Sequence, residues 1–165
     1  MFNDVDLKIL KSLGINGRES FLKLSRQLGL PNSTIRQRIK RLTNIGVIRF
    51  KCEVDPNMFP RIFIMFIGII ASSKMEKQLD EILKIPNVLY AGSVTGKYDY
   101  MALIAATSRE MAADIIDNKI YKIEGVLHTE SFLILKDKGL FIPSDKFCDI
   151  YENVLTQNEK IIENL

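Results

Sequence analysis

The spacing of apolar residues changes along the chain, and this change predicts two parts with different folds. In residues 1–50, apolar residues recur at the three- and four-residue spacing of amphipathic helices. After residue 60, runs rich in Ile, Val and Phe alternate with further helical patterns, as expected for a mixed sheet and helix domain. Residues 51–60 contain the turn-forming sequence Asp-Pro-Asn and a second proline, and are predicted to be a linker. A chain of 165 residues has room for two small domains.

Helix-start and helix-stop signals divide the first part into short helices. Asn3 followed by Asp6 is a variant of the capping box, and a helix is predicted over roughly 4–13. Ser20 is a good N-cap for a second helix, and Gly29 is expected to end it. A third helix is predicted from about residue 32 to the glycine at 46. Three short helices with a tight turn between the second and third are typical of a helix-turn-helix.

The third predicted helix has one apolar side and one polar side. Ile35, Ile39 and Leu42 fall on one stripe, and the opposite face carries Arg, Lys, Gln and Ser. Such a helix suits the DNA major groove. Residues near its N-terminal end are the candidates for base edges: Ser33, Thr34, Arg36 and Gln37. The candidates for phosphate contacts are Lys23, Arg26, Arg38, Lys40, Arg41 and Arg49.

The charge distribution supports this interpretation. Residues 1–50 carry ten Lys or Arg and three Asp or Glu, a net charge of +7. Residues 51–165 carry 13 and 17, a net charge of −4, so the overall +3 hides an uneven division. A basic part joined to a mildly acidic part indicates that the basic part meets a polyanion, here double-stranded DNA. The simpler alternative is a solvated basic helix on a small three-helix bundle.

The second part predicts the order β-α-β-β-α-β, which is the ferredoxin-like split unit. Its predicted elements cover 62–70, 75–85, 88–95, 100–106, 108–120 and 126–135. If both helices cover one face of the sheet, the other face needs a partner, and homodimerisation is the simplest solution.

A helical extension follows the predicted sheet domain. A helix of roughly 144–160 begins after Pro143 and places its apolar residues on one stripe. We expect it to dock on the protein's own dimer in preference to a foreign partner. The residues of the stripe are Phe147, Ile150, Tyr151, Val154 and Leu155.

Composition excludes several other classes of protein. Cys52 and Cys148 lie far apart, so they are expected to be free thiols, and no close-spaced metal site is available. His128, the only histidine, is expected to be structural. No catalytic motif is present, so we expect neither an enzyme nor a cofactor. The longest apolar run is about half the length of a membrane helix, and no secretory signal is visible; a cytoplasmic protein without membrane contact is expected.

Several segments together resemble the Lrp/AsnC (feast/famine) transcriptional regulators, of the archaeal type. The resemblance covers residues 2 to about 138. Its parts are the opening sequence FNDVDLKIL, Arg18 with Ser20, the helix STIRQRIKRL followed by GVI, the turn VTGKYDY at 94–100, and EGV with Thr129. In the family, Ser usually caps the third helix; Pro31 stands there in this chain, so we expect Asn32 or Ser33 to act as the cap.

The resemblance implies an oligomer with a sensing domain. It implies dimers that assemble further into tetramers or octamers, and an effector, often an amino acid, bound between the sensing domains of neighbouring dimers. Carried over by position, the effector residues are Gly96, Tyr98, Asp99, Tyr100 and, less directly, Thr129. Asp99 could pair with an α-ammonium group, and glycine amides could bind a carboxylate. The alternative is that this turn only closes its hairpin and builds the oligomer.

The expected architecture is therefore α+β. It comprises a helix-turn-helix DNA-binding domain (1–50), a linker (51–60), a ferredoxin-like sensing and dimerisation domain (61–138) and a C-terminal helical extension (139–165). The expected function is sequence-specific transcription regulation. One alternative is an architectural protein that coats DNA with little sequence preference. Another, which the basic first part disfavours, is a metabolic enzyme or its regulatory subunit.

Overall fold

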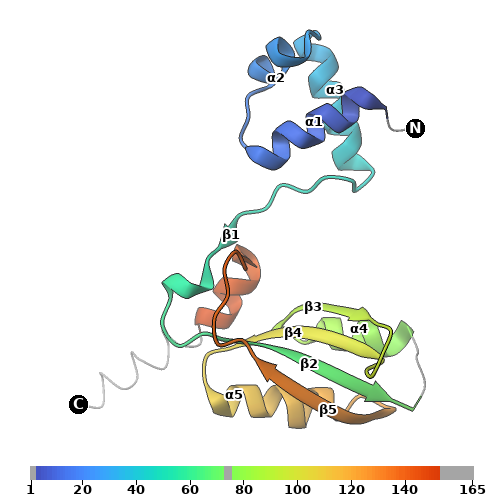
Figure 1. The fold of residues 1–165 in the computed structure, drawn as a ribbon, viewed down its shortest axis with the longest axis vertical. Coiled ribbons are helices and arrows are strands. Elements are labelled where there is room, and N and C mark those ends of the chain that lie inside the picture. Colours follow the sequence, from blue (N-terminus) through green and yellow to red (C-terminus); the bar gives the residue numbers. More distant parts are fainter. Residues whose placement is uncertain (1–2, 73–75, 153–165) are drawn as a thin grey trace. The chain divides into compact units, whose positions relative to one another are not determined.

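The computed structural model describes residues 3–72 and 76–152, and these form two compact units. The helical unit is Met1–Lys51 and the sheet unit is Cys52–Leu165 (Figure 1). None of the described helices is long and apolar enough to cross a membrane.

The helical unit contains the three predicted helices, α1 (Asp4–Ile15), α2 (Phe21–Leu28) and α3 (Asn32–Asn44). Asn3 and Asp6 close the predicted capping box at the start of α1. The Ser20 side chain accepts the backbone N–H of the third residue of α2, and a glycine in the left-handed conformation ends that helix. These features confirm the predicted helix-turn-helix. Its core is small: one buried cluster comprises Ile9, Leu13, Leu24, Ile35 and Ile39, and Leu42 is also buried.

The start of α3 differs from the expectation. Neither Asn32 nor Ser33 caps the helix: Pro31 occupies the N-cap position, and no side chain provides a capping hydrogen bond there. The fixed φ of proline, −57° here, already suits a helix start, which explains why a side-chain cap is dispensable. Asn32 and Ser33 therefore lie inside the first turn of the helix.

The sheet unit has the predicted ferredoxin-like order. Four antiparallel strands lie in the order β3-β4-β2-β5, with helices between them in sequence. The strands are β2 (Phe63–Ala71), β3 (Val88–Ser93), β4 (Tyr100–Ala106) and β5 (Val126–Leu133). The helices are α4 (Glu76–Lys84) and α5 (Arg109–Asp114), and a π-helical segment, η2 (Ile115–Ile120), continues α5.

The two helices cover one face of the sheet, called the inner face here (Figure 1). Fifteen buried residues form the core between them, including Ile67 and Ile69 on β2 and Ile104 on β4. Alternation along β2 sends its other residues, such as Phe66, to the opposite outer face.

The segment 51–60, predicted as a linker, carries regular structure. It contains β1 (Glu53–Val54), which pairs antiparallel with β6 (Ile142–Pro143), and a short 3₁₀ helix, η1 (Pro56–Met58). The chain near the C-terminal extension therefore packs beside the segment that follows the helical unit.

The extension covers part of the outer face. Residues 144–152 are helical, and Phe147 and Ile150 pack with Ile64 and Leu103 of the sheet. The other face was expected to need a partner, and the extension was expected to dock on the protein's own dimer; it covers part of this face within its own chain. Farther along the same face, Phe66 and Phe132 remain 40% and 41% exposed. Val154 and Leu155, also placed in the predicted stripe, lie outside the described residues.

Candidate DNA interface and effector site

Helix α3 presents the predicted contrast between its two sides. Ile35, Ile39 and Leu42 are buried against α1 and α2. Ser33, Arg36, Gln37 and Lys40 are exposed, and Thr34 is half-buried. The apolar stripe packs into the unit and leaves Ser33, Arg36, Gln37 and Lys40 open to a ligand.

Arg38, which is half-buried, and Arg41, which is exposed, both pair with a carboxylate of their own unit. The Arg38 guanidinium donates to one carboxylate oxygen of Asp6 at 2.9 Å, and the Arg41 guanidinium donates to the other at 2.6 Å. Arg38 also donates to the side-chain oxygen of Asn3 at 3.1 Å. The prediction that both arginines serve as phosphate contacts is therefore in conflict with this geometry, because each already donates to the one carboxylate of Asp6 inside the unit.

Asp6 lies at the centre of this network. Its side chain is fully buried, and burial by itself raises the pKa of a carboxyl group. The hydrogen bond from Arg38, the backbone hydrogen bond of Asn3 and the charge of Arg41 outweigh burial and hold the pKa of Asp6 below its ordinary value. Asp6 is therefore ionised and joins α1 to α3.

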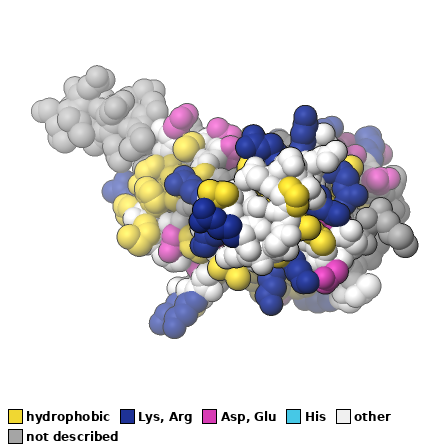
Figure 2. Space-filling model, turned by 90° about the horizontal axis from the view of Figure 1, so that it is seen from above, with side chains coloured by type: hydrophobic (Ala, Val, Ile, Leu, Met, Phe, Trp, Pro, Cys, Tyr) yellow, Lys and Arg dark blue, Asp and Glu magenta, His cyan; other side chains and the backbone are white. Residues whose placement is uncertain are grey.

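The remaining basic candidates differ in their surroundings. The Arg36 guanidinium lies 5.2 Å from the ring centroid of Phe21, within the range of a cation–π contact. Lys23 pairs with Glu19 at 2.7 Å on the surface. Arg26 and Lys40 are exposed and have no ion-pair partner among the described residues. In the view of Figure 2, lysine and arginine side chains are scattered among uncharged side chains and a few acidic ones.

A shallow hollow lies beside the exposed face of α3. It has a volume of about 450 Å³ and is lined by Asn3 together with Thr34, Gln37, Arg38 and Arg41. Two of the predicted base-reading residues thus border the arginine network. The predicted base-reading residues all lie on α3, the predicted phosphate residues lie on α2 and α3 except Arg49, and Arg49 is exposed after the end of α3.

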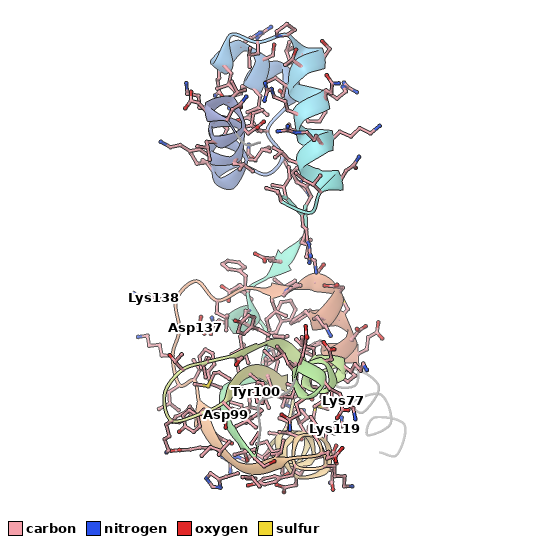
Figure 3. The ribbon with its side chains drawn as sticks, turned by 90° about the vertical axis from the view of Figure 1, so that its right-hand side faces the viewer. Lys77, Asp99, Tyr100, Lys119, Asp137 and Lys138 are labelled. Atoms are coloured by element: carbon pink, nitrogen blue, oxygen red, sulfur yellow. The ribbon has the colours of Figure 1, made fainter. Side chains whose placement is uncertain are left out.

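The turn predicted to bind an effector lies between β3 and β4. Asp99 fixes this turn, because its carboxylate accepts the backbone N–H of Ala71 at 2.9 Å and its own N–H donates to Ile69. Tyr100 is 2% exposed, and its hydroxyl donates to the side chain of Gln78 at 2.9 Å. Figure 3 shows Asp99 and Tyr100 inside the sheet unit. Tyr100 is thus part of the inner core, out of reach of a ligand on the surface.

Tyr98 lies on the outer face of the sheet. Its ring covers Gly68, where an added Cβ would lie 2.7 Å from the ring. Its hydroxyl donates to Glu130, which also pairs with Lys97. These hydrogen bonds, with that from Lys97 the stronger, hold the pKa of Glu130 below its ordinary value.

Thr129 and Gly96 lie apart from this cluster. Thr129 pairs with Ile69 on the inner-face register, and its N–H donates to the hydroxyl of Tyr121. Gly96 adopts a φ of 114°, which residues other than glycine rarely adopt. The five predicted effector residues therefore do not share one face of the sheet within a single chain.

Sequence reasoning predicted Asp6 only as part of a helix cap and did not predict its place in the arginine network, and it missed Glu130 and Gln78. Asp6 lies three residues before Ile9 and seven before Leu13, so the helical stripe indicated its burial. Glu130 is opposite Gly68 in the strand register, which sequence alone does not define. The Gln78 side chain fills the space beside Gly125. The amphipathic pattern of its helix gave no sign that this polar residue is buried.

Two family models match the chain in the order of its units. The AsnC-type helix-turn-helix domain matches residues 2–43, and the Lrp/AsnC ligand binding domain matches residues 64–138. This chain belongs to the Lrp/AsnC family. It is a helix-turn-helix transcriptional regulator that binds DNA, and its relatives are regulators and not enzymes.

Named relatives agree with this assignment. The HTH-type transcriptional regulator Ptr1 of Methanocaldococcus jannaschii is 30% identical over 82% of this chain and 93% of its own length. The HTH-type transcriptional regulator FL11 of Pyrococcus furiosus is 31% identical over 82% of this chain and 91% of its own. The solved structure of Escherichia coli AsnC matches with a TM-score of 0.73 and 25% identity, over 85% of this chain and 96% of that one.

A structure of a transcriptional regulator from Neisseria meningitidis, solved as a complex with L-Met, has the same fold. It matches with a TM-score of 0.71 and 23% identity, over 85% of this chain and 94% of that one.

Proposed function

We propose that this Lrp/AsnC regulator places α3 of each protomer of a homodimer in the DNA major groove. Ser33, Thr34, Arg36 and Gln37 read base edges there, and Lys23, Arg26, Lys40 and Arg49 contact phosphates. The observation that carries this proposal is the division of α3 into a buried apolar stripe and an exposed polar face.

A pair of substitutions tests this division of roles. Arg36→Ala should lower affinity for a preferred duplex, selected by the full chain from a random pool, and relax base preference. Lys40→Ala should weaken binding to all sequences alike and reduce the salt dependence. Fluorescence anisotropy over a salt series measures both. The same loss on selected and random duplexes for both variants would refute the division, and a flat salt response of the unaltered chain would refute phosphate contact.

The dimer is proposed to form through the uncovered part of the outer face. Phe66, Tyr90 and Phe132 are exposed there, and a large exposed apolar area on a sheet marks an interaction site. A two-fold dimer would present two α3 helices to half-sites about one DNA turn apart. Sedimentation of Phe66→Asp should show dissociation relative to the unaltered chain. Unchanged sedimentation would exclude this face as the dimer interface.

A protein that coats DNA without sequence preference would share the basic face. The ratio of affinities for selected and random duplexes separates the two functions, because phosphate contacts carry no sequence information. Specific regulation predicts a ratio of about 10³ or more. Footprints spread evenly over a long fragment would favour the coating function.

We further propose that an amino acid is the effector and that it binds near the turn at 94–100. The L-Met complex of the Neisseria regulator supports this class of ligand. Gly96, Tyr98 and Asp99 offer backbone amides, a hydroxyl and a carboxylate in one turn, and higher assembly would bring a second copy to it. A thermal-shift screen of the twenty amino acids should raise the Tm with at least one, and Tyr98→Phe should reduce that shift. No shift with any amino acid would indicate an effector-independent regulator.

A further inference from the structure

Asp6 is the only charged side chain that is buried among the residues that the structure describes. Asp6 takes part in both the N-terminal cap of α1 and the ion pairs with α3. With Asn3 it closes the capping box of α1, with reciprocal hydrogen bonds of 3.3 and 3.1 Å. Its two oxygens also accept from Arg38 and Arg41, which lie one turn apart on α3. The carboxylate is thus shared between the start of α1 and the middle of the DNA-reading helix.

This sharing constrains both arginines. Arg38 is only 27% exposed and Arg41 44% exposed, and each uses a guanidinium nitrogen on Asp6. A buried carboxylate that lost these partners would have an uncompensated charge, which proteins avoid strongly. Moving either arginine onto a phosphate would therefore leave Asp6 poorly satisfied. Lys40, between them in sequence, faces solvent instead.

We infer that Asp6 is a positioning residue for DNA recognition, which fixes α3 on α1 and withholds Arg38 and Arg41 from the phosphates. The inference rests on the proposed placement of α3 in the major groove. Phosphate contacts strengthen binding to every sequence, whereas base contacts discriminate. By engaging a guanidinium nitrogen of each arginine with its one negative charge, Asp6 limits the sequence-independent part of the affinity while it holds the base-reading face in place. Asp6 therefore lowers the affinity for DNA of any sequence and raises the ratio of specific to non-specific affinity.

The substitution Asp6→Asn in the full chain tests this role. Asparagine is nearly isosteric and keeps hydrogen-bonding groups for the cap, but it removes the charge that retains the arginines. We expect the slope of log K against log salt on a random duplex to steepen by up to about two phosphates. Non-specific binding would then fall about tenfold more than that of the unaltered chain between 50 and 200 mM salt. The ratio of specific to non-specific affinity should fall.

Glu19→Gln is the matched control. It also adds one positive charge to the helical unit, and it releases Lys23, but it does not touch α3. Its slope should steepen by no more than about one phosphate, with the specificity ratio unchanged. Equal slopes and ratios for both variants, or an unchanged slope for folded Asp6→Asn, would overturn the inference. Far-UV circular dichroism establishes folding.

A second comparison tests whether Arg38 is withheld from the phosphates, even if Asp6→Asn does not fold. In the otherwise unaltered chain, Arg38→Gln should leave the salt slope on a random duplex unchanged, whereas Lys40→Gln should reduce it by about one phosphate. Equal reductions would overturn the inference, because Arg38 would then contact DNA. If the unaltered chain shows no salt-dependent DNA binding, the proposed function itself fails, which is a distinct result.

Discussion

The two units each contain a carboxylate held by a cation and a second donor, but the surroundings of these carboxylates differ. Asp6 in the helical unit is fully buried between two arginines. Glu130 in the sheet unit accepts from Lys97 and Tyr98 with 40% of its side chain exposed, and Lys97 is 63% exposed. Water and salt screen the second cluster more strongly than the first, because the Asp6 carboxylate is buried even though its arginines are partly exposed. A carboxylate paired with basic side chains therefore joins two helices in the helical unit, whereas in the sheet unit it lies on the surface.

The difference follows from the size of the two cores. The helical unit has five residues in its buried apolar cluster, whereas the inner-face cluster of the sheet unit has fifteen. A small core supplies little stability, so we expect the helical unit to depend on the Asp6 network to fix α3. In the sheet unit, packing fixes the fold, and charged groups on the outer face are left available for assembly or ligand binding.

The largest effect should come from the core of the sheet unit. Ile67 is fully buried at the centre of β2, so Ile67→Ala should destabilise this unit by about 4 kcal/mol through lost burial and a cavity. All five tyrosines lie in Cys52–Leu165 and the chain has no tryptophan, so tyrosine fluorescence during urea unfolding reports this unit alone. Hydrogen exchange of α1–α3 peptides should stay unchanged. Equal loss of protection in both units would show that they unfold together.

Removal of the buried carboxylate should produce the next largest effect, in the other unit. Asp6→Ala breaks the capping box and leaves Arg38 and Arg41 without their acceptor, at a cost of about 3 kcal/mol. Exchange of α1 and α3 peptides should accelerate, and the tyrosine transition should not move. Asp4→Ala is the control, because Asp4 pairs only on the surface, with Lys8. If the two variants behave alike, the helical unit does not depend on Asp6.

The sequence predicted the elements of both units because their signals are local. Asn3 with Asp6, Ser20 and the glycines mark helix ends through contacts within a few residues. The strand order also followed, since β-α-β-β-α-β chains have few ways to bury two helices. The pairing of β1 with β6 escaped prediction, because it joins two residues each across nearly ninety positions and leaves no periodic pattern.

The functional residues divide in the same way. The exposed face of α3 follows from helical periodicity, and the structure agrees with it at Arg36 and Lys40. Helical periodicity cannot reveal which basic side chains already pair with a carboxylate of the same unit. Arg38 and Arg41 reach Asp6 across more than thirty positions, and that contact depends on how α1 packs against α3. The burial of Tyr100 escaped prediction for a similar reason: position in a motif does not determine which face of a strand is buried.

The stability of the helical unit at low pH should depend on the ionisation of Asp6. The pKa of Asp6 is lowered in the folded chain, although burial opposes the effect of Arg38 and Asn3. Asp6 therefore contributes its full stability above its ordinary pKa of 3.8, and this contribution is lost as the pH falls through the lower folded value. Helical circular dichroism should show an acid transition below pH 4 that moves in Asp6→Asn. A transition identical in both proteins would mean that other carboxyl groups control it.

The smallest effect should come from the exposed cluster of the sheet unit. Lys97→Met removes the cation on Glu130 but keeps an apolar stem near the Tyr98 ring, so the Tm followed by tyrosine fluorescence should fall only slightly. The fall should vanish in 1 M salt, where the Debye length is about 3 Å, whereas the loss caused by Asp6→Ala should persist there. The pKa of Glu130, lowered first by the hydrogen bond from Lys97, should rise in the variant. A large fall in the Tm of Lys97→Met that persists in 1 M salt would show that the Glu130 cluster stabilises the sheet unit as Asp6 stabilises the helical unit. The contrast between the two units would then be wrong.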